Sequence, residues 1–411
     1  MIIWQSMPFP KKPTTKRLIY LDHAATTATD PQVVKVMAPF WTKNFANPSA
    51  LYSLGQITRE AVETARATIA EILFTQPDCV TFTSGGTEAN NLAIFGTIKK
   101  QLSNYKKLHI ITTSIEHQSV LEPIKELAKH GVLVTYLPVN ERGEISVKEL
   151  IAAIRPETVL ISVMYANNEI GTINPIAEIG RELLKYRKNN KTEWPFFHTD
   201  ACQAAGTLDL HTERLHVDLM TINGSKIYGP KGVGALFVRR GVTLKPIMFG
   251  GGQENTLRSG TENVPAIIGF AKALELVNKN FAKEFERQTK LRDYFWKEIS
   301  KKIPEVKLNG PELTGDNRLA NNLNGQFTGL EGETLVLYLD AYGIICATGS
   351  ACATDSDDAS HVLTACGLTL VEANASVRFT LGKTTSKKDI EVVMKYLPGI
   401  VKGIREMQKS A

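Results

Sequence analysis

Cysteine is scarce in this chain, whose 411 residues include only Cys79, Cys202, Cys346, Cys352 and Cys366. An odd number at irregular spacings argues against a disulfide framework and favours a reducing compartment. The last three lie near one another in the sequence, yet their separations match no CxxC pattern. We therefore expect no metal site.

Long apolar runs and blocks of like charge are also missing. No apolar stretch reaches the roughly 18 residues that a membrane-spanning helix needs. Residues 1–17 place apolar residues before basic ones, the reverse of a secretory signal. The formal net charge of +6 is spread along the chain, which does not favour DNA binding and suits a small anionic ligand or an acidic protein partner. The expected location is cytoplasmic, without membrane contact.

Short apolar strands alternate with amphipathic helices through the first two thirds of the chain. The periodicity predicts strands at 80–83, 108–112, 133–137, 158–164, 196–199 and 234–238, and helices at 87–96, 120–129, 147–154 and 176–187. This alternation predicts an α/β fold with a mostly parallel sheet between layers of helices.

The pattern changes after Pro265, where a long helix is predicted to about residue 301. A few strands and a closing helix follow, and Pro398-Gly399 predicts a kink in that helix. We place a domain boundary near residue 270. Residues 22–270 would form a large cofactor-binding domain, and residues 1–21 and 271–411 a smaller α+β domain.

Lys226 and Asp200 are the most informative pair of residues. Lys226 lies in a glycine-rich turn, and Asp200 ends an apolar strand. A lysine in such a turn can form a Schiff base with an aldehyde cofactor, and a carboxylate can keep that cofactor's pyridine nitrogen protonated. Alone, the aspartate could be a helix cap and the lysine a solvated loop residue. Together they point to pyridoxal 5'-phosphate.

Several polar turns suit the phosphate of such a cofactor. Gly86 and Thr87 join a strand to a helix start, where free backbone amides and the helix dipole attract anions. An ordinary helix cap would look the same. Asn223 and Ser225, next to the lysine, could add donors, and Thr261 is a further hydroxyl in a glycine turn.

Other candidate site residues follow predicted strands. His117 lies beyond the strand at 108–112, where ligands of open α/β sheets gather, and an imidazole there could stack on a ring and transfer protons. Asn168 and Gln203 supply neutral donors. Arg378, between apolar neighbours, is typical of a guanidinium that binds a substrate carboxylate.

Cys352 lies among small and polar residues, in a segment of about 349–361 that can bend and reach. We interpret it as a mobile nucleophile rather than a buried, inert thiol, because its neighbours are too polar for a core. Asp355, Asp357 and Asp358 follow it, and like charges oppose thiolate formation.

A series of motifs in this order resembles the cysteine desulfurases of the class V aminotransferase superfamily. They include residues 20–27, 83–88, 116–117, 167–171, 198–203, 225–232, 258–261 and 349–352. The long segment around Cys352 is similar to that of the housekeeping and nitrogen-fixation branch.

The resemblance implies a fold type I homodimer with a seven-stranded, mostly parallel sheet. It would convert L-cysteine to L-alanine and leave sulfur on Cys352 as a persulfide for an acceptor protein, either an iron-sulfur scaffold or a tRNA-thiolation protein. By motif, Lys226 is the Schiff-base lysine, Asp200 the pyridine partner and His117 the acid or base. The remaining roles follow in the same way: Gln203 and Asn168 as contacts of cofactor and substrate; Gly86, Thr87, Asn223, Ser225 and the Thr261 of a second subunit at the phosphate; Asn47 and Arg378 at the substrate carboxylate.

Two positions depart from the family pattern. Ser225 stands where histidine is usual, and Asn223 where a hydroxyl residue is usual. Both keep a donor, so they bear on cofactor affinity more than on reaction type. Two alternatives remain open from the sequence. One is a selenocysteine lyase or other β-lyase with the same cofactor, and the other is a weakly catalytic scaffold for iron-sulfur assembly.

Overall fold

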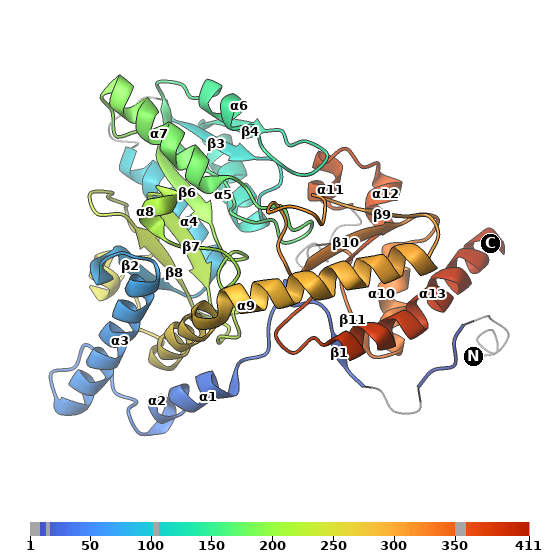
Figure 1. The fold of residues 1–411 in the computed structure, drawn as a ribbon. Coiled ribbons are helices and arrows are strands. Elements are labelled where there is room, and N and C mark those ends of the chain that lie inside the picture. The colour runs from blue at the N-terminus through green and yellow to red at the C-terminus, as the bar shows by residue number, and fades with distance from the viewer. Residues whose placement is uncertain (1–8, 14–16, 102–106, 350–358, 411) are drawn as a thin grey trace.

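The computed structural model describes residues 9–13, 17–101, 107–349 and 359–410. Cys352 and the three aspartates that follow it lie outside these ranges. Within the described residues the chain builds one large sheet, two small sheets and helices around them (Figure 1).

The large sheet has seven strands in the order β2-β8-β7-β6-β5-β3-β4. Their bounds are β2 Val80–Thr83, β3 His109–Thr113, β4 Leu133–Leu137, β5 Thr158–Ser162, β6 Phe196–Asp200, β7 Leu219–Asn223 and β8 Gly234–Val238. All pairs are parallel except the two that involve β8. The mostly parallel α/β sheet predicted from the sequence is confirmed.

Helices cover both faces of this sheet. One face packs on α4 (Gly86–Gln101) and α5 (Gln118–Lys129), and the other on α3 (Ser53–Ile72), α7 (Ile176–Asn190) and the start of α9 (Val264–Lys302). The shorter helices of this part are α1 Pro31–Met37, α2 Pro39–Thr42, α6 Val147–Ala152 and α8 Thr212–Leu215, with 3-10 turns at Pro77–Cys79 and Gln253–Thr256. Burial on both faces explains why the central strands are almost continuously apolar.

A second hydrophobic core lies beyond the large sheet. It packs α10 (Gly332–Ala341) and α13 (Lys387–Ser410) against an antiparallel sheet of β9 (Val306–Leu308), β10 (Asn322–Phe327) and β12 (Ser376–Thr380). The N-terminal strand β1 (Ile19–Tyr20) pairs with β11 (Ile344–Ile345) here. Two short helices, α11 (His361–Ala365) and α12 (Leu370–Asn374), precede β12 in the chain.

Helix α9 joins the two cores. Figure 1 shows it running from the helices beside the large sheet to α13. Its residues Phe270 and Leu274 belong to the first core, whereas Phe295 and Ile299 belong to the second. The boundary expected near residue 270 falls inside this continuous helix, and the division into two domains stays a prediction.

Two helices bear on the sequence-based expectations: α4 is longer than predicted, and the kink expected in α13 at Pro398 stays a prediction. α4 runs through Gly96, where an end was predicted, because this glycine allows close packing: a Cβ there would lie 3.0 Å from the Lys245 carbonyl oxygen. α13 is continuous through Pro398. Apolar side chains on both sides of the proline, such as Leu397 and Ile400, are buried in the same core, so packing favours the helix despite the missing hydrogen bond.

Candidate active site

A cavity of about 430 Å³ opens at the carboxyl ends of the large sheet's parallel strands. His117 follows β3, Asn168 follows β5, Asp200 ends β6 and Asn223 ends β7, which is where ligands of open α/β sheets bind. The other predicted residues on its wall are Gly86, Thr87, Gln203, Ser225, Lys226 and Arg378. The fold thus brings together residues that are up to 292 positions apart, from Gly86 to Arg378.

Asp200 is held by two donors. Its Oδ1 accepts the Cys202 backbone N–H at 2.9 Å, and its Oδ2 accepts the Asn90 side-chain amide at 2.7 Å. The residue is 7% exposed. A nearly buried carboxylate that is fixed on both oxygens by neutral groups keeps its charge available to a cationic ligand atom.

His117 is oriented through the same network. Its Nδ1 accepts the Ser119 backbone N–H at 3.1 Å, which caps α5. The neutral ring therefore carries its proton on Nε2. The Ser119 hydroxyl lies 2.8 Å from Nδ1 and accepts the Asn90 amide at 2.8 Å. Asn90 and Ser119 thus connect the imidazole to Asp200, and neither residue was singled out from the sequence.

Lys226 reaches the cavity from the turn after β7. Its Nζ donates to the carbonyl oxygens of Ala24 at 2.7 Å and Ala25 at 2.5 Å. The Gln203 amide donates to the same Ala24 oxygen at 2.9 Å. The N-terminal segment is itself fixed by the Thr27 N–H, which donates to the Ser225 carbonyl at 2.9 Å. Lysine and N-terminal segment therefore form one hydrogen-bonded unit.

The Gly86 end of the cavity suits a phosphate. Gly86 begins α4, and a Cβ there would lie 2.8 Å from the Cys202 Sγ and 3.3 Å from the Asn223 side-chain nitrogen. The Asn223 Oδ1 is buried and has no hydrogen-bond partner within the described ranges. The close approach that only glycine permits, the free backbone N–H groups of the helix start and the neighbouring Asn223 side-chain nitrogen, a donor, fit a phosphate-bearing cofactor.

Arg378 also lines the cavity. It is 1% exposed, and its guanidinium donates to Asp22 Oδ1 at 2.7 Å and to the Asn168 carbonyl oxygen at 3.1 Å. Its Nε is buried without a partner in the described part of the chain. A fixed guanidinium with a remaining donor is suited to a carboxylate ligand. The Asp22 contact was not predicted.

Two predicted residues do not line the cavity of this single chain. Thr261 and Asn47 are exposed, and the Asn47 Oδ1 accepts the Ser49 backbone N–H at 2.8 Å. Thr261 was assigned to a second subunit. The roles of both residues stay predictions, as does that of Cys352, which lies outside the described residues.

Burial shifts the pKa of several groups beside the cavity. It raises the pKa of Glu116 to about 8, although hydrogen bonds from Met164 and Thr113 act in the opposite direction. It lowers the pKa of His198 to about 4. It also raises the pKa of the Cys202 thiol. At neutral pH His198 and Cys202 are therefore uncharged, and Glu116 is mostly protonated.

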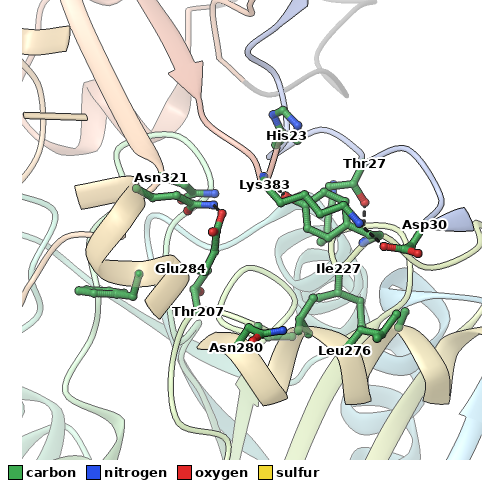
Figure 2. A pocket seen from close by; sticks show the side chains of 18 of the residues that line it. His23, Thr27, Asp30, Thr207, Ile227, Leu276, Asn280, Glu284, Asn321 and Lys383 are labelled. Atoms are coloured by element: carbon green, nitrogen blue, oxygen red, sulfur yellow. Dashed lines mark hydrogen bonds and ion pairs between the residues drawn. The ribbon is translucent and has the colours of Figure 1, made fainter. Parts of the chain in front are cut away.

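A second cavity, of about 420 Å³, lies on the other side of the Lys226 turn (Figure 2). Ile227 and Leu276 contribute to its apolar wall, and Lys383 lies beside Asp30 with an ion pair between them. The Tyr228 hydroxyl accepts the Lys383 backbone N–H at 2.7 Å. These contacts connect the lysine turn to the segment after β12.

Among the described residues, no cluster of three or more His, Cys, Asp or Glu side chains could hold a metal ion. None of the described helices has both the length and the apolar content needed to cross a bilayer.

Comparison with known proteins identifies the family. The aminotransferase class-V family matches residues 19–393. A "Cysteine desulfurase IscS" of Dictyoglomus turgidum is 46% identical over 390 residues, covering 95% of this chain and 96% of that protein. Its Clostridium botulinum counterpart is 48% identical with the same coverage. The chain therefore belongs to the class-V aminotransferase family and, within it, to the cysteine desulfurases.

Solved structures agree with this assignment. A NifS-like protein superposes with a TM-score of 0.85 at 32% identity, covering 96% of this chain and 100% of that one. A structure described as SspA in complex with cysteine has a TM-score of 0.76 at 36% identity, with 89% and 99% of the two chains covered. The predicted fold type I architecture is confirmed, and family membership implies a pyridoxal phosphate enzyme.

Proposed function

We propose that this chain converts L-cysteine to L-alanine with pyridoxal 5'-phosphate and stores the released sulfur on Cys352. The observation that carries the proposal is the convergence of Lys226, Asp200 and His117 on one cavity that also contains a helix start suited to phosphate and an arginine. The cofactor supplies an electron sink that allows the Cα proton of an amino acid to leave and weakens its Cβ–S bond.

The proposed roles follow from position. Lys226 would hold the cofactor covalently, and Asp200 would face its pyridine nitrogen. Gly86, Thr87, Asn223, Ser225 and the Thr261 of a second subunit would hold the phosphate. Arg378, with Asn47, would bind the substrate carboxylate, while Asn168 and Gln203 would contact cofactor and substrate.

His117 would work as the proton carrier beside the ring. The Ser119 backbone N–H occupies its Nδ1, so Nε2 is the nitrogen that gives and takes the proton. The chain through Ser119 and Asn90 to Asp200 would keep the imidazole at a constant orientation. Lys226 Nζ would move a proton at the substrate Cα once its covalent link is released.

Cys352 would take the sulfur. Its thiolate attacks the substrate sulfur, an S–S bond forms, and the electron pair of the Cβ–S bond stays on Cβ, which then gains a proton. Cysteine and the enzyme thiol thus become alanine and an enzyme persulfide, so all atoms and electrons are accounted for. The persulfide would pass to an acceptor protein for iron-sulfur assembly or tRNA thiolation.

We also propose a homodimer. Large apolar side chains gather on the exposed segment 41–52, where Trp41 is 61% exposed, Phe45 69% and Leu51 88%. Exposed apolar groups in such numbers usually mark a protein interface. A second copy that covers this segment would also supply the predicted phosphate contact of Thr261.

The assay is release of alanine from L-cysteine by protein supplied with the cofactor. We expect equal amounts of alanine and, with a thiol reductant, sulfide. Lys226→Ala should abolish both, whereas Lys185→Ala, an exposed helix residue paired with Glu182, should keep the wild-type rate. Turnover of selenocysteine without turnover of cysteine would favour the lyase alternative instead, and a protein with no turnover of either would contradict the proposal.

A further inference from the structure

Glu169 is a buried carboxylate beside the active site for which the reaction gives no role. It is 1% exposed and follows Asn168 directly. Its backbone is fixed on both sides, because its N–H donates to Asn167 Oδ1 at 2.8 Å and its carbonyl accepts the Asn324 amide at 3.1 Å. No ion pair involves Glu169 within the described ranges. A buried anion without a cation is unfavourable unless hydrogen bonds compensate it.

The segment that carries Cys352 begins and ends at this carboxylate. Ser360 donates its hydroxyl to Glu169 Oε2 at 2.5 Å. A Cβ on Gly349 would lie 3.2 Å from the same oxygen, so the backbone of Gly349 already packs against it. The two residues that flank positions 350–359 therefore meet at one side chain of the loop that follows β5.

Ser360 has a second function that fixes its position. Its hydroxyl oxygen accepts the Leu363 backbone N–H at 3.2 Å and so caps α11, while its hydrogen goes to Glu169. One hydroxyl thus holds the helix start and the carboxylate together. Val362 and Leu363 are buried against Ile115 and Ile170 of the large-sheet part, which anchors α11 there.

His361 adds a contact to the other side of the cavity. Its Nε2 lies 2.9 Å from the Glu116 carbonyl oxygen, and because a carbonyl only accepts, Nε2 carries the proton. Glu116 immediately precedes His117. Ser360 thus binds Glu169, the residue after Asn168, and His361 binds the residue before His117.

From these contacts we propose that Glu169 is a positioning residue for sulfur transfer: through Ser360 it fixes the base of the Cys352 segment relative to the cofactor cavity. This inference rests on the proposed role of Cys352. Positioning matters because a misplacement of about 1 Å between reacting groups can slow a reaction by about a hundredfold. The contact would act on the transfer of sulfur and not on the binding of cysteine or of the cofactor.

Substitutions of Ser360 separate positioning from helix capping. Ser360→Asp keeps a good N-cap but replaces the donor with a carboxylate that repels Glu169. Ser360→Thr keeps both contacts. Thr364→Val removes a hydroxyl of the same helix that donates to the Ser360 carbonyl oxygen at 3.1 Å and not to Glu169, so it is the matched control.

The measurement is the rate at which holoenzyme, mixed with L-cysteine, gains sulfur on Cys352, followed by quenching and mass spectrometry. We expect Ser360→Asp to be slower by about tenfold to a hundredfold, with KM for cysteine and cofactor absorbance unchanged. Ser360→Thr and Thr364→Val should stay within about twofold of wild type. Adding Glu169→Gln to Ser360→Asp should restore the rate, because the amide can donate to the new carboxylate.

Three results would overturn the inference: a Ser360→Asp rate within about twofold of wild type, a slow rate accompanied by loss of cofactor, or no rescue by Glu169→Gln. The wild-type sample tests the proposed function separately. If wild-type protein gains no sulfur on Cys352, the proposed function itself is contradicted.

Discussion

Glu116→Gln should change how the stability of this protein depends on pH. Glu116 is fully buried, and its Oε1 accepts the Thr113 hydroxyl at 2.7 Å and the Met164 backbone N–H at 2.8 Å. Its Oε2 has no hydrogen-bond partner within the described ranges. Burial raises its pKa from 4.5 to about 8, so the folded protein keeps a proton that the unfolded chain releases.

The sign and size of the effect follow from this shift. Where the folded state binds more protons, the free energy of unfolding decreases as pH rises, here from about pH 4.5 toward pH 8. The free energy of unfolding falls by roughly 3 kcal/mol between about pH 5 and pH 8. The slope is about 1.4 kcal/mol per pH unit and is smaller near the two pKa values, where the proton is only partly bound. Glutamine stays neutral at every pH and its carbonyl oxygen can keep both hydrogen bonds.

The assay is urea unfolding of wild type and variant at several pH values. Glu116→Gln should match wild type near pH 5 and be more stable by roughly 3 kcal/mol near pH 8. Glu122→Gln, an exposed residue of α5 paired with Lys125, is the control and should follow the wild-type curve. Parallel curves for wild type and Glu116→Gln would refute the reasoning that this carboxyl is kept protonated by burial.

Three further outcomes are expected. Burial lowers the pKa of His198 to about 4, so the stabilisation that comes from keeping this histidine neutral is complete above about pH 6.5. The free energy of unfolding should fall by roughly 3 kcal/mol as the pH decreases from there toward about pH 4. Urea unfolding of Glu116→Gln should show this decrease, and adding His198→Gln should remove it. Asp200→Asn should weaken cofactor binding and lower turnover while circular dichroism stays native, because the asparagine oxygen can still accept the Cys202 N–H; undiminished activity would count against its role. Arg378→Lys should raise KM for cysteine by about tenfold or more without changing cofactor absorbance, and an unchanged KM would mean that another group binds the substrate carboxylate.

The sequence was informative where function and secondary structure depend on local patterns. The strand that leads to Asp200 and the glycine turn around Lys226 are local features and could be predicted, whereas the strand β7 (Leu219–Asn223) was not predicted. Asn90 and Ser119 could not be found in this way, because each is an ordinary helix residue until the packing of α4 and α5 brings it between His117 and Asp200.

Long-range contacts were likewise beyond sequence reasoning. The ion pair of Arg378 with Asp22 joins residues 356 positions apart, and Ser360 meets Glu169 across 191 positions. The helix predicted to end at Gly96 continues to Gln101, and Gly96 packs closely on Lys245. In each case the missing information is which element packs against which, and not the chemistry of the residue.

The most direct measurement is to find where sulfur goes when the holoenzyme reacts with one equivalent of L-cysteine. Digestion and mass spectrometry should show one extra sulfur atom on the peptide that contains Cys352, together with an equal amount of alanine, and Cys352→Ser should retain the cofactor but form almost no alanine. Extra sulfur on Cys202 or another thiol, or undiminished alanine formation by Cys352→Ser, would contradict the account.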